Sequence, residues 1–250
     1  MKVSIVTATF NSVATLQDAM DSVFSQDYPN IEYIIIDGES TDGTMELVRS
    51  FGKKVNVVVS EPDKGLYDAM NKGIKLATGD IIGILNSDDF FTSNSVISQI
   101  VEAFEANKKL DGVHGDLYYV DAQDTSKIIR YWHTSEYRSH AFFKGWHPAH
   151  PTLYLRREVY EKFGVFDLRF PLSADFELML RFFECCKIKT KHLNLVMIRM
   201  RIGGATSRNL KAILRGIGQC NRAFRVNGLC PPLFYTFYRL CPKLLQYVRK

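Results

Sequence analysis

The stretch Asp80-Ile-Ile-Gly-Ile-Leu-Asn-Ser-Asp-Asp-Phe-Phe91 decides the fold of this 250-residue chain. Its apolar run, residues 81–85, is typical of a strand buried on both faces of a sheet. The run is followed by four polar residues, and the last two are Asp88 and Asp89. Two adjacent carboxylates at the end of a buried strand are costly unless a positive group neutralises them. A divalent cation, Mg²⁺ or Mn²⁺, meets that need, and a solvated acidic turn is the alternative.

Strand-like and helix-like segments alternate over the first ninety residues. Apolar runs predict strands at residues 3–8, 33–36, 55–59 and 81–85, and apolar residues at helical spacing predict helices that begin near residues 13, 45 and 66. Asn11 and Ser12 are expected to cap the first helix. This alternation indicates an α/β fold with a mostly parallel, Rossmann-like central sheet flanked by helices. Ligands of such sheets bind outside the carboxyl ends of the strands, where the sequence places Thr7, Ala8, Thr9, Asp37, residues 60–65, Asp88 and Asp89.

The second half of the chain is predicted to mix helices and strands. Helical spacing predicts a helix over residues 94–106, and apolar runs predict strands over residues 113–120 and 128–132. A short helix is expected to end at Gly164, and Ser173 is expected to cap another.

Three titratable residues of this half, Asp175, His147 and His150, are candidates for function. Asp175 and Glu177 fall in the first turn of the helix after Ser173, where the helix dipole favours negative charge. That structural role is one explanation of Asp175, and a catalytic role is the other. His147 and His150 lie in an aromatic stretch, where each either contacts a ligand or is structural.

Two common nucleotide-binding loops are missing, which argues against a dehydrogenase-type sheet and against a P-loop enzyme. The first strand leads into Thr-Ala-Thr-Phe-Asn11, not the G-x-G-x-x-G of dinucleotide-binding folds, and the chain contains no P-loop sequence. The five cysteines are odd in number and lack C-x-x-C spacing, which favours a reduced, cytoplasmic environment and no zinc site. The N-terminus lacks the features of a signal peptide, and no apolar run approaches the ~20 residues of a spanning helix.

Charge is divided unevenly along the chain. Residues 185–250 contain 14 Lys and Arg and no acidic residue, whereas residues 1–184 have a net charge of −9. Residues 209–225 predict an amphipathic helix, and basic and aromatic residues are interleaved beyond Pro232. This combination is typical of a segment that lies on an anionic membrane surface, and packing of the tail on the rest of the chain is the alternative. No nucleic acid is expected as a partner, because no DNA- or RNA-binding motif accompanies the basic residues.

Five segments together resemble the successive motifs of family 2 glycosyltransferases with the GT-A fold. They occur in the family's order, at residues 3–11, 34–44, 60–73, 85–89 and 175–181. The form with Asp-Gly after the second strand is similar to bacterial enzymes of colanic-acid, capsule and O-antigen assembly. The resemblance implies a catalytic domain over residues 1–205, with a nucleotide-binding half (1–90) and an acceptor half (91–205). Residues 206–250 are then a basic, helical, amphipathic tail.

The resemblance also implies a role for each matching residue. The nucleotide sugar is expected to contact Thr7, Ala8, Thr9, Asn11, Asp37, Asp63, Lys64 and Asp88. Asp88 and Asp89 are expected to bind a divalent cation, Mn²⁺ or Mg²⁺, together with the donor diphosphate. Asp175 matches the catalytic base of an inverting transfer. Three positions depart from the family's pattern, since Asp is common at positions 38 and 86 and Glu at position 174, where this chain has Gly38, Asn86 and Ala174.

These observations predict a glycosyltransferase attached peripherally to the cytoplasmic face of the cell membrane. It is expected to move a sugar from a nucleotide donor, most often UDP in this family, to a growing lipid-linked saccharide. The cation would stabilise the leaving diphosphate, and a carboxylate must accept the proton of the acceptor hydroxyl. A sugar-nucleotide pyrophosphorylase is one alternative, but residues 7–11 lack the Gly-rich, Arg-containing loop that it needs. The other alternative is a non-catalytic sugar- or membrane-binding module. The presence of Asp88, Asp89 and Asp175 is evidence against it.

Overall fold

The apolar runs of the first ninety residues lie side by side in one sheet. The computed structural model describes residues 1–203, 210–233 and 235, with the backbone alone for residues 210–214. Four strands pair in parallel in the order β3-β2-β1-β4, with the bounds β1 Val3–Thr9, β2 Ile31–Asp37, β3 Val57–Ser60 and β4 Ile81–Ile84. β1 and β4 are buried along their whole length, as expected for strands covered on both faces. β3 begins two residues later than predicted, and a 3₁₀ turn at Gly52–Lys54 and a bend at residues 55–56 precede it.

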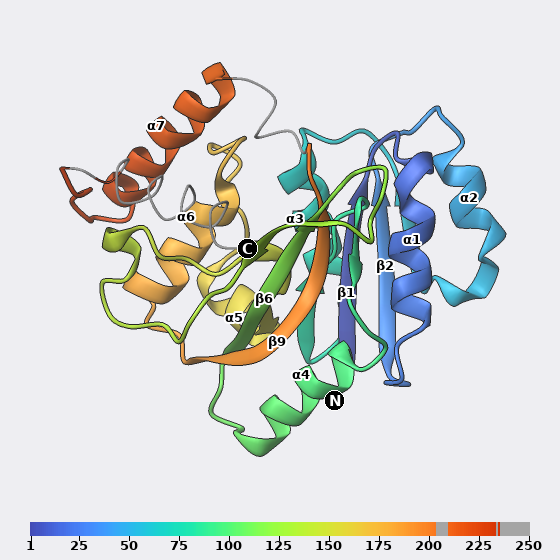
Figure 1. Cartoon of the computed structure of the whole chain (residues 1–250), viewed down its shortest axis with the longest axis horizontal. Coiled ribbons are helices and arrows are strands. Elements are labelled where there is room, and N and C mark those ends of the chain that lie inside the picture. Colours follow the sequence, from blue (N-terminus) through green and yellow to red (C-terminus); the bar gives the residue numbers. More distant parts are fainter. Residues whose placement is uncertain (204–209, 234, 236–250) are drawn as a thin grey trace.

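Beyond β4 the sheet becomes mixed. β8 (Tyr154–Arg156) pairs antiparallel with β4 and with β6 (Gly112–Val120), and β9 (Thr190–Arg201) runs parallel to β6. Two short strands, β5 (Asp89–Phe91) and β7 (Ile128–Trp132), pair antiparallel with β9 and β6. Figure 1 shows β6 and β9 crossing the middle of the molecule side by side. The α/β class is confirmed, with a parallel first half and a mixed second half.

Two sets of helices cover opposite faces of the sheet. Buried apolar residues of α1, α2 and α4 form one core cluster with it, and those of α3, α5, α6 and α7 form the other. The helices are α1 Val13–Phe24, α2 Thr44–Ser50, α3 Leu66–Leu76, α4 Val96–Ala106, α5 Arg157–Phe163, α6 Ala174–Leu180 and α7 Leu210–Val226. In Figure 1, α1 and α2 lie at one end of the molecule and α6 and α7 at the other.

A close approach between strands requires glycine in the middle of β4. A Cβ atom at Gly83 would lie 2.0 Å from Cε1 of Tyr154 on β8, and that ring is fully buried. The ring cannot move out of the packed core without cost, so a larger residue here would force the two strands apart.

The start of α1 corrects the prediction that Asn11 and Ser12 cap it with their side chains. Ser12 occupies the N-cap position but makes no side-chain cap, and its hydroxyl donates to the carbonyl of Phe10. Asn11 has a φ of +48°, a left-handed conformation that asparagine tolerates better than most residues. Its Oδ1 accepts the backbone N–H of Thr41 at 2.9 Å. Asn11 therefore ties the end of β1 to the loop that follows β2.

The predicted amphipathic helix of the tail is present as α7. Its residues Cys220, Ala223 and Phe224 are fully buried in the cluster that also contains α6. This part of the tail packs on the sheet-bearing part of the chain, as one of the two interpretations predicts. The interleaved basic and aromatic residues at 236–250 lie outside the described residues, and the boundary between residues 205 and 206 stays a prediction. Within the described part of the chain, no helix has both the length and the apolar character to cross a membrane.

Candidate active site

The carboxyl ends of β1, β2 and β3 bring three polar residues together. Thr9 is paired with Asp37, and Asp37 with Ser60, in the register of the parallel strands. Asp37 is fully buried, and its Oδ1 and Oδ2 accept the hydroxyls of Ser40 and Ser60 at 2.5 and 2.6 Å. Thr9 is also buried, and its hydroxyl has no hydrogen-bond partner among the described residues. The predicted neighbours thus meet at one sheet edge, where Asp37 organises the loops after β2 and β3.

Thr7 and Ala8, which precede Thr9 in β1, have buried side chains. The hydroxyl of Thr7 is buried and lies 3.1 Å from the Tyr33 hydroxyl, and the Ala8 methyl is buried in the cluster beneath α3. Any contact of these two residues with a ligand is therefore expected through peptide groups.

The loop between β3 and α3 folds over the end of β2. A Cβ atom at Gly38 would lie only 2.5 Å from Oδ2 of Asp63, so the carboxylate occupies the space that a side chain at position 38 would need. Oδ1 of Asp63 accepts the backbone N–H of Gly65 at 2.7 Å. Lys64 is exposed, and its backbone N–H donates to Asp68 at 3.0 Å. Gly38 thus allows Asp63 to lie against the strand end that carries Asp37.

Asp88 and Asp89 form an adjacent acidic pair after β4. Asp89 is fully buried, whereas Asp88 is partly exposed. The side-chain amide of Asn86 donates to Oδ2 of Asp89 at 2.7 Å, but Oδ1 has no hydrogen-bond partner among the described residues. Burial raises the pKa of Asp89 well above its usual value, and the neighbouring charge of Asp88 raises it further. Burial raises the pKa of Asp88 as well.

The donor set at this pair fits a divalent cation. Two carboxylates in a buried setting, one with an unpartnered oxygen, are stabilised by a hard cation that takes oxygen ligands. No cluster of three or more His, Cys, Asp or Glu side chains suited to a metal occurs in the described part of the chain. Mg²⁺ is commonly held by one or two carboxylates together with the phosphates of a substrate. The pair therefore suits a cation that binds with a phosphorylated ligand better than a permanent structural ion.

Arg201, which ends β9, supports the acidic pair from outside. Its Nη1 donates to the backbone carbonyl of Asp88 at 2.6 Å, and its guanidinium also forms an ion pair with Asp18 of α1. The guanidinium lies over the ring of Phe90, 5.1 Å from its centroid. It thus links β9 and α1 to the turn that carries the two carboxylates.

Asp175 lies in the first turn of α6 and is held by a residue from another helix. The hydroxyl of Tyr67 donates to Oδ1 of Asp175 at 3.0 Å. Burial, and next the charge of Asp175, raises the pKa of Tyr67, so this phenol stays a donor. Tyr67 is in the first turn of α3, directly after the loop that carries Asp63. One hydrogen bond therefore joins Asp175 to the helix that follows the loop of Asp63 and Lys64, which are predicted to contact the nucleotide sugar.

The other acidic residue of that turn has a different environment. Glu177 is buried and pairs with Arg181 at 3.0 Å, and it also accepts the side-chain amide of Asn227 at 3.1 Å. Asp175 forms no ion pair within the described ranges. Glu177 is therefore held by an ion pair and an amide, whereas the contact that holds Asp175 is the Tyr67 hydroxyl.

The two candidate histidines lie near α6. The ring of His147 packs edge-on against Trp132 and against Phe176, the neighbour of Asp175, with centroids 5.1 and 5.8 Å apart. The ring of His150 packs on Phe166, and burial lowers its pKa, so His150 is neutral near pH 7. Direct contact of either histidine with a ligand stays a prediction.

Tyr67 and Arg201 could not be identified as site residues from local sequence. Tyr67 stands within the segment 60–73, but its partner Asp175 is 108 residues away. Arg201 is one of many basic residues late in the chain. The sequence also gives no sign that the buried Asp116 of β6 contacts His133 and His192, at 2.8 and 3.0 Å.

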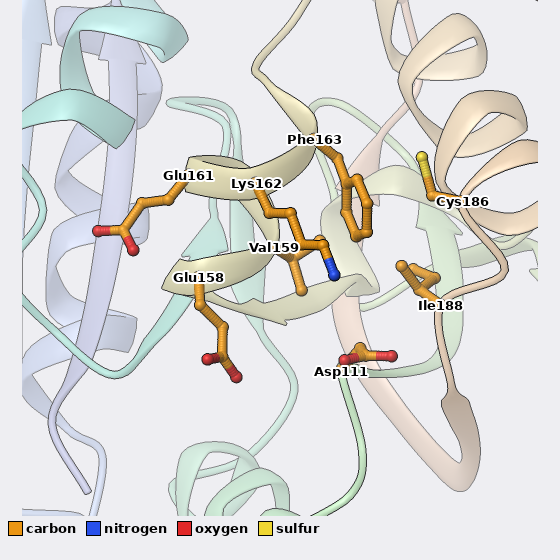
Figure 2. Close-up of a pocket in the computed structure, with 8 residues that line it drawn as sticks. All are labelled: Asp111, Glu158, Val159, Glu161, Lys162, Phe163, Cys186 and Ile188. Atoms are coloured by element: carbon orange, nitrogen blue, oxygen red, sulfur yellow. The ribbon is translucent and has the colours of Figure 1, made fainter.

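A cavity of about 610 Å³ lies away from these residues. Figure 2 shows that α5 supplies most of its lining, with Asp111, Cys186 and Ile188 facing the helix. Asp111 precedes β6, which runs in the same direction as β4 because both are antiparallel to β8. The cavity is therefore at the amino edge of the sheet, opposite the edge where the predicted site residues gather.

Comparison with known sequences identifies similar proteins. Residues 4–164 match the family described as glycosyl transferase family 2. A PGL/p-HBAD biosynthesis glycosyltransferase of Mycobacterium bovis is 26% identical over 210 residues, which cover 83% of this chain and 79% of that protein. An uncharacterized glycosyltransferase of Mycobacterium tuberculosis is 31% identical over 232 residues, which cover 90% of this chain and 86% of that protein.

Solved structures share the fold at low sequence identity. S. aureus TarS matches 100% of this chain with a TM-score of 0.70 and 17% identity, and this chain spans 44% of that protein. A shorter TarS structure in complex with UDP-GlcNAc has a TM-score of 0.66 and 17% identity, over 91% of this chain and 65% of that one. A mannosyltransferase of Pyrobaculum calidifontis in complex with GDP-Man and Mn²⁺ has a TM-score of 0.63 and 17% identity, over 96% of this chain and 72% of that one.

Proposed function

The chain belongs to glycosyl transferase family 2, and from this premise we propose that it transfers one sugar, with inversion, from a nucleotide sugar to a lipid-linked saccharide. The pathway we propose is the synthesis of a bacterial cell-surface polysaccharide. The proposal rests mainly on how three carboxylates are arranged relative to the sheet. The acidic Asp88–Asp89 pair lies at the carboxyl edge of the sheet, and Asp175 is tied by Tyr67 to the helix that follows the loop at that same edge.

The donor is proposed to bind across the ends of β1, β2 and β3. The peptide groups of residues 7–9, the Asp37 loop and the Asp63–Lys64 loop surround this edge, and Asn11 joins two of these segments. Similar structures hold UDP-GlcNAc in one case and GDP-Man in the other, which supports a nucleotide sugar as the donor class. A UDP-sugar is our first choice.

The divalent cation is proposed to bind to Asp88 and Asp89. The unpartnered Oδ1 of Asp89 and the partly exposed carboxylate of Asp88 supply hard oxygen ligands. When bound, such a cation stabilises negative charge that develops on a leaving diphosphate. The Mn²⁺ in the similar mannosyltransferase structure supports this assignment.

Asp175 is proposed to be the base that accepts the proton of the acceptor hydroxyl. Tyr67 holds Oδ1, so Oδ2 is left to face the acceptor. A positioned carboxylate in this role contributes roughly 10²–10⁴ in rate. In an inverting transfer the base and the leaving group lie on opposite faces of the sugar, which explains why the base comes from α6 and not from the turn after β4.

The tail is proposed to bind the anionic inner face of the cell membrane. Arg215, Arg222 and Arg225 are exposed on α7, and the Leu233 side chain is 91% exposed. Each basic residue near an anionic surface contributes about 1 kcal/mol, and apolar side chains insert between the lipids. Full-length protein is expected to sediment with vesicles rich in phosphatidylserine at low salt. Protein that stays in the supernatant would contradict the proposed membrane binding and would leave the proposal for the donor site unaffected.

The proposed donor site can be tested by thermal unfolding in the presence of UDP-, GDP- and dTDP-sugars, with and without Mn²⁺. A ligand at 100 times its Kd adds about 2.7 kcal/mol to the unfolding free energy. For a chain of this size that corresponds to a rise in Tm of roughly 5–10 °C. One nucleotide class is expected to produce the shift, and only with the cation. Stabilisation without hydrolysis or transfer under any metal would favour a binding module, and no shift with any donor would refute the proposed site.

A further inference from the structure

Helix α6 begins without the side-chain cap that Ser173 is predicted to supply. Ser173 occupies the N-cap position, but its side chain makes no cap hydrogen bond. Its hydroxyl donates instead to Oε1 of Gln219 on α7, at 3.1 Å. The same oxygen accepts the backbone N–H of Leu172 at 3.0 Å. One amide oxygen of α7 therefore binds both residues that precede α6, and Asp175 is the second residue of that helix.

The part of α7 that carries Gln219 is fixed to α6. Phe224 is fully buried, and its ring packs against Phe176 with centroids 5.9 Å apart. Directly after α7, the side-chain amide of Asn227 donates to Oε1 of Glu177 at 3.1 Å. Gln219 therefore lies on a helix that is packed against α6.

We propose that Gln219 is a positioning residue for Asp175. This inference rests on the proposed function, because it requires Asp175 to be the base. The first turn of α6 has no side-chain cap, so the position of that turn depends on tertiary contacts of the residues before it. Without the Gln219 oxygen, Leu172 and Ser173 lose their common partner, and the first turn can shift relative to the Tyr67 hydroxyl. A displacement of about 1 Å at a reacting group can lower a rate by about 10²-fold.

The consequence is that α7 is part of the catalytic unit. A displacement of this helix would reach Asp175 through the two hydrogen bonds at Gln219.

Three variants of the full-length protein test this inference. Gln219→Leu removes the acceptor at similar volume, Gln219→Glu keeps an acceptor oxygen, and Asn221→Ala is a control on the same helix. Gln219→Leu is expected to lower kcat tenfold or more, with the donor KM changed less than twofold. Gln219→Glu is expected to retain most of kcat, and Asn221→Ala to match the wild type. Tm is measured for each variant, and kcat is measured well below the lowest Tm.

The outcomes separate this inference from the proposed function. A wild-type kcat for Gln219→Leu, or an equal loss in Gln219→Leu and Gln219→Glu, overturns the positioning role. A loss that follows Tm and includes KM also overturns it, because it indicates a general defect in packing. In each of these cases the wild-type protein still transfers sugar and Asp175→Asn still does not. If the wild type transfers no sugar, or Asp175→Asn retains full turnover, the proposed function itself is wrong.

Discussion

Replacing Asp89 by Asn is expected to stabilise the metal-free protein and to make it insensitive to divalent cations. Asp89 is fully buried, its Oδ1 has no partner among the described residues, and Asp88 adds a second negative charge beside it. Asn keeps the oxygen that accepts the amide of Asn86 at 2.7 Å and removes the buried charge. The same change removes a carboxylate from the proposed cation site.

The size of the effect follows from the burial of this one group. A buried polar group left without a partner costs about 1–3 kcal/mol, and a charged one costs more. The amide nitrogen that replaces Oδ1 in Asn also lacks a partner, so the variant recovers only the part of the cost that is due to the charge. We therefore expect a gain of about 1–3 kcal/mol in unfolding free energy, which corresponds to a rise in Tm of roughly 2–12 °C. The sign depends on pH. The pKa of Asp89 is higher in the folded protein than in the unfolded chain. Between about pH 4 and that raised pKa, the folded protein therefore holds a proton that the unfolded chain has released. The unfolding free energy of the wild type consequently falls as the pH rises through this range. The gain in the variant should thus be larger at pH 7.5 than at pH 4.5.

Thermal unfolding with EDTA and with Mn²⁺, at both pH values, measures the effect. Mn²⁺ with the nucleotide sugar is expected to raise the Tm of the wild type and to leave that of the variant unchanged. Asp21→Asn, a change to an exposed carboxylate on α1, is the control and should shift stability by less than about 0.5 kcal/mol. A less stable Asp89→Asn protein, or an undiminished response to Mn²⁺, would show that Asp89 is a satisfied structural residue.

Three further predictions follow from other parts of the molecule. Tyr67→Phe removes the hydroxyl that donates to Asp175 and keeps the ring. Because a hydrogen bond to a charged group contributes about 1.5–3 kcal/mol, kcat should fall roughly ten- to a hundredfold. An unchanged kcat in steady-state assays would show that this contact does not matter for transfer. Burial raises the pKa of Glu32, but hydrogen bonds from three side chains outweigh burial and lower this pKa to about 2. The ionised Glu32 therefore adds its full contribution to the unfolding free energy above pH 4.5, and that contribution is lost as the pH falls towards 2. Glu32→Gln should therefore lower the unfolding free energy, measured with urea at pH 7, by about 1–3 kcal/mol. Between pH 7 and pH 3.5 the variant should lose less of its unfolding free energy than the wild type. An equal loss in the two proteins would contradict this prediction. Removal of divalent cations with EDTA should lower transfer on the order of a hundredfold or more, with recovery on addition of Mn²⁺; full activity in EDTA would mean that protein groups alone stabilise the leaving diphosphate.

The parallel half of the fold is predictable because its strands are continuous apolar runs. Residues 81–85 identify β4 without reference to the rest of the chain, since a strand covered on both faces needs no polar alternation. The mixed half is harder to predict. β5 and β8 contain three residues each, too few to show a period, and β9 mixes polar and apolar residues along its length. These strands depend on partners far away in the sequence.

Candidate site residues are predictable where a motif is local, and their contacts are not. Asp37, Asp63, Asp88 and Asp89 each follow a predicted strand, so the parallel topology alone places them at one edge. The bonds that give Asp175 its orientation come from Tyr67 directly and from Gln219 through Ser173. The helix-cap preference of Ser173 favours a local bond, but the acceptor on α7 competes for its hydroxyl. Only the folded chain shows which partner prevails.

The most direct test of the proposed mechanism is sugar transfer by Asp175→Asn, measured beside its binding of the nucleotide sugar with Mn²⁺. We expect kcat to fall by roughly 10²–10⁴ while the rise in Tm produced by donor and cation stays at its wild-type size. A folded Asp175→Asn protein that transfers sugar at the wild-type rate would contradict the assignment of the base.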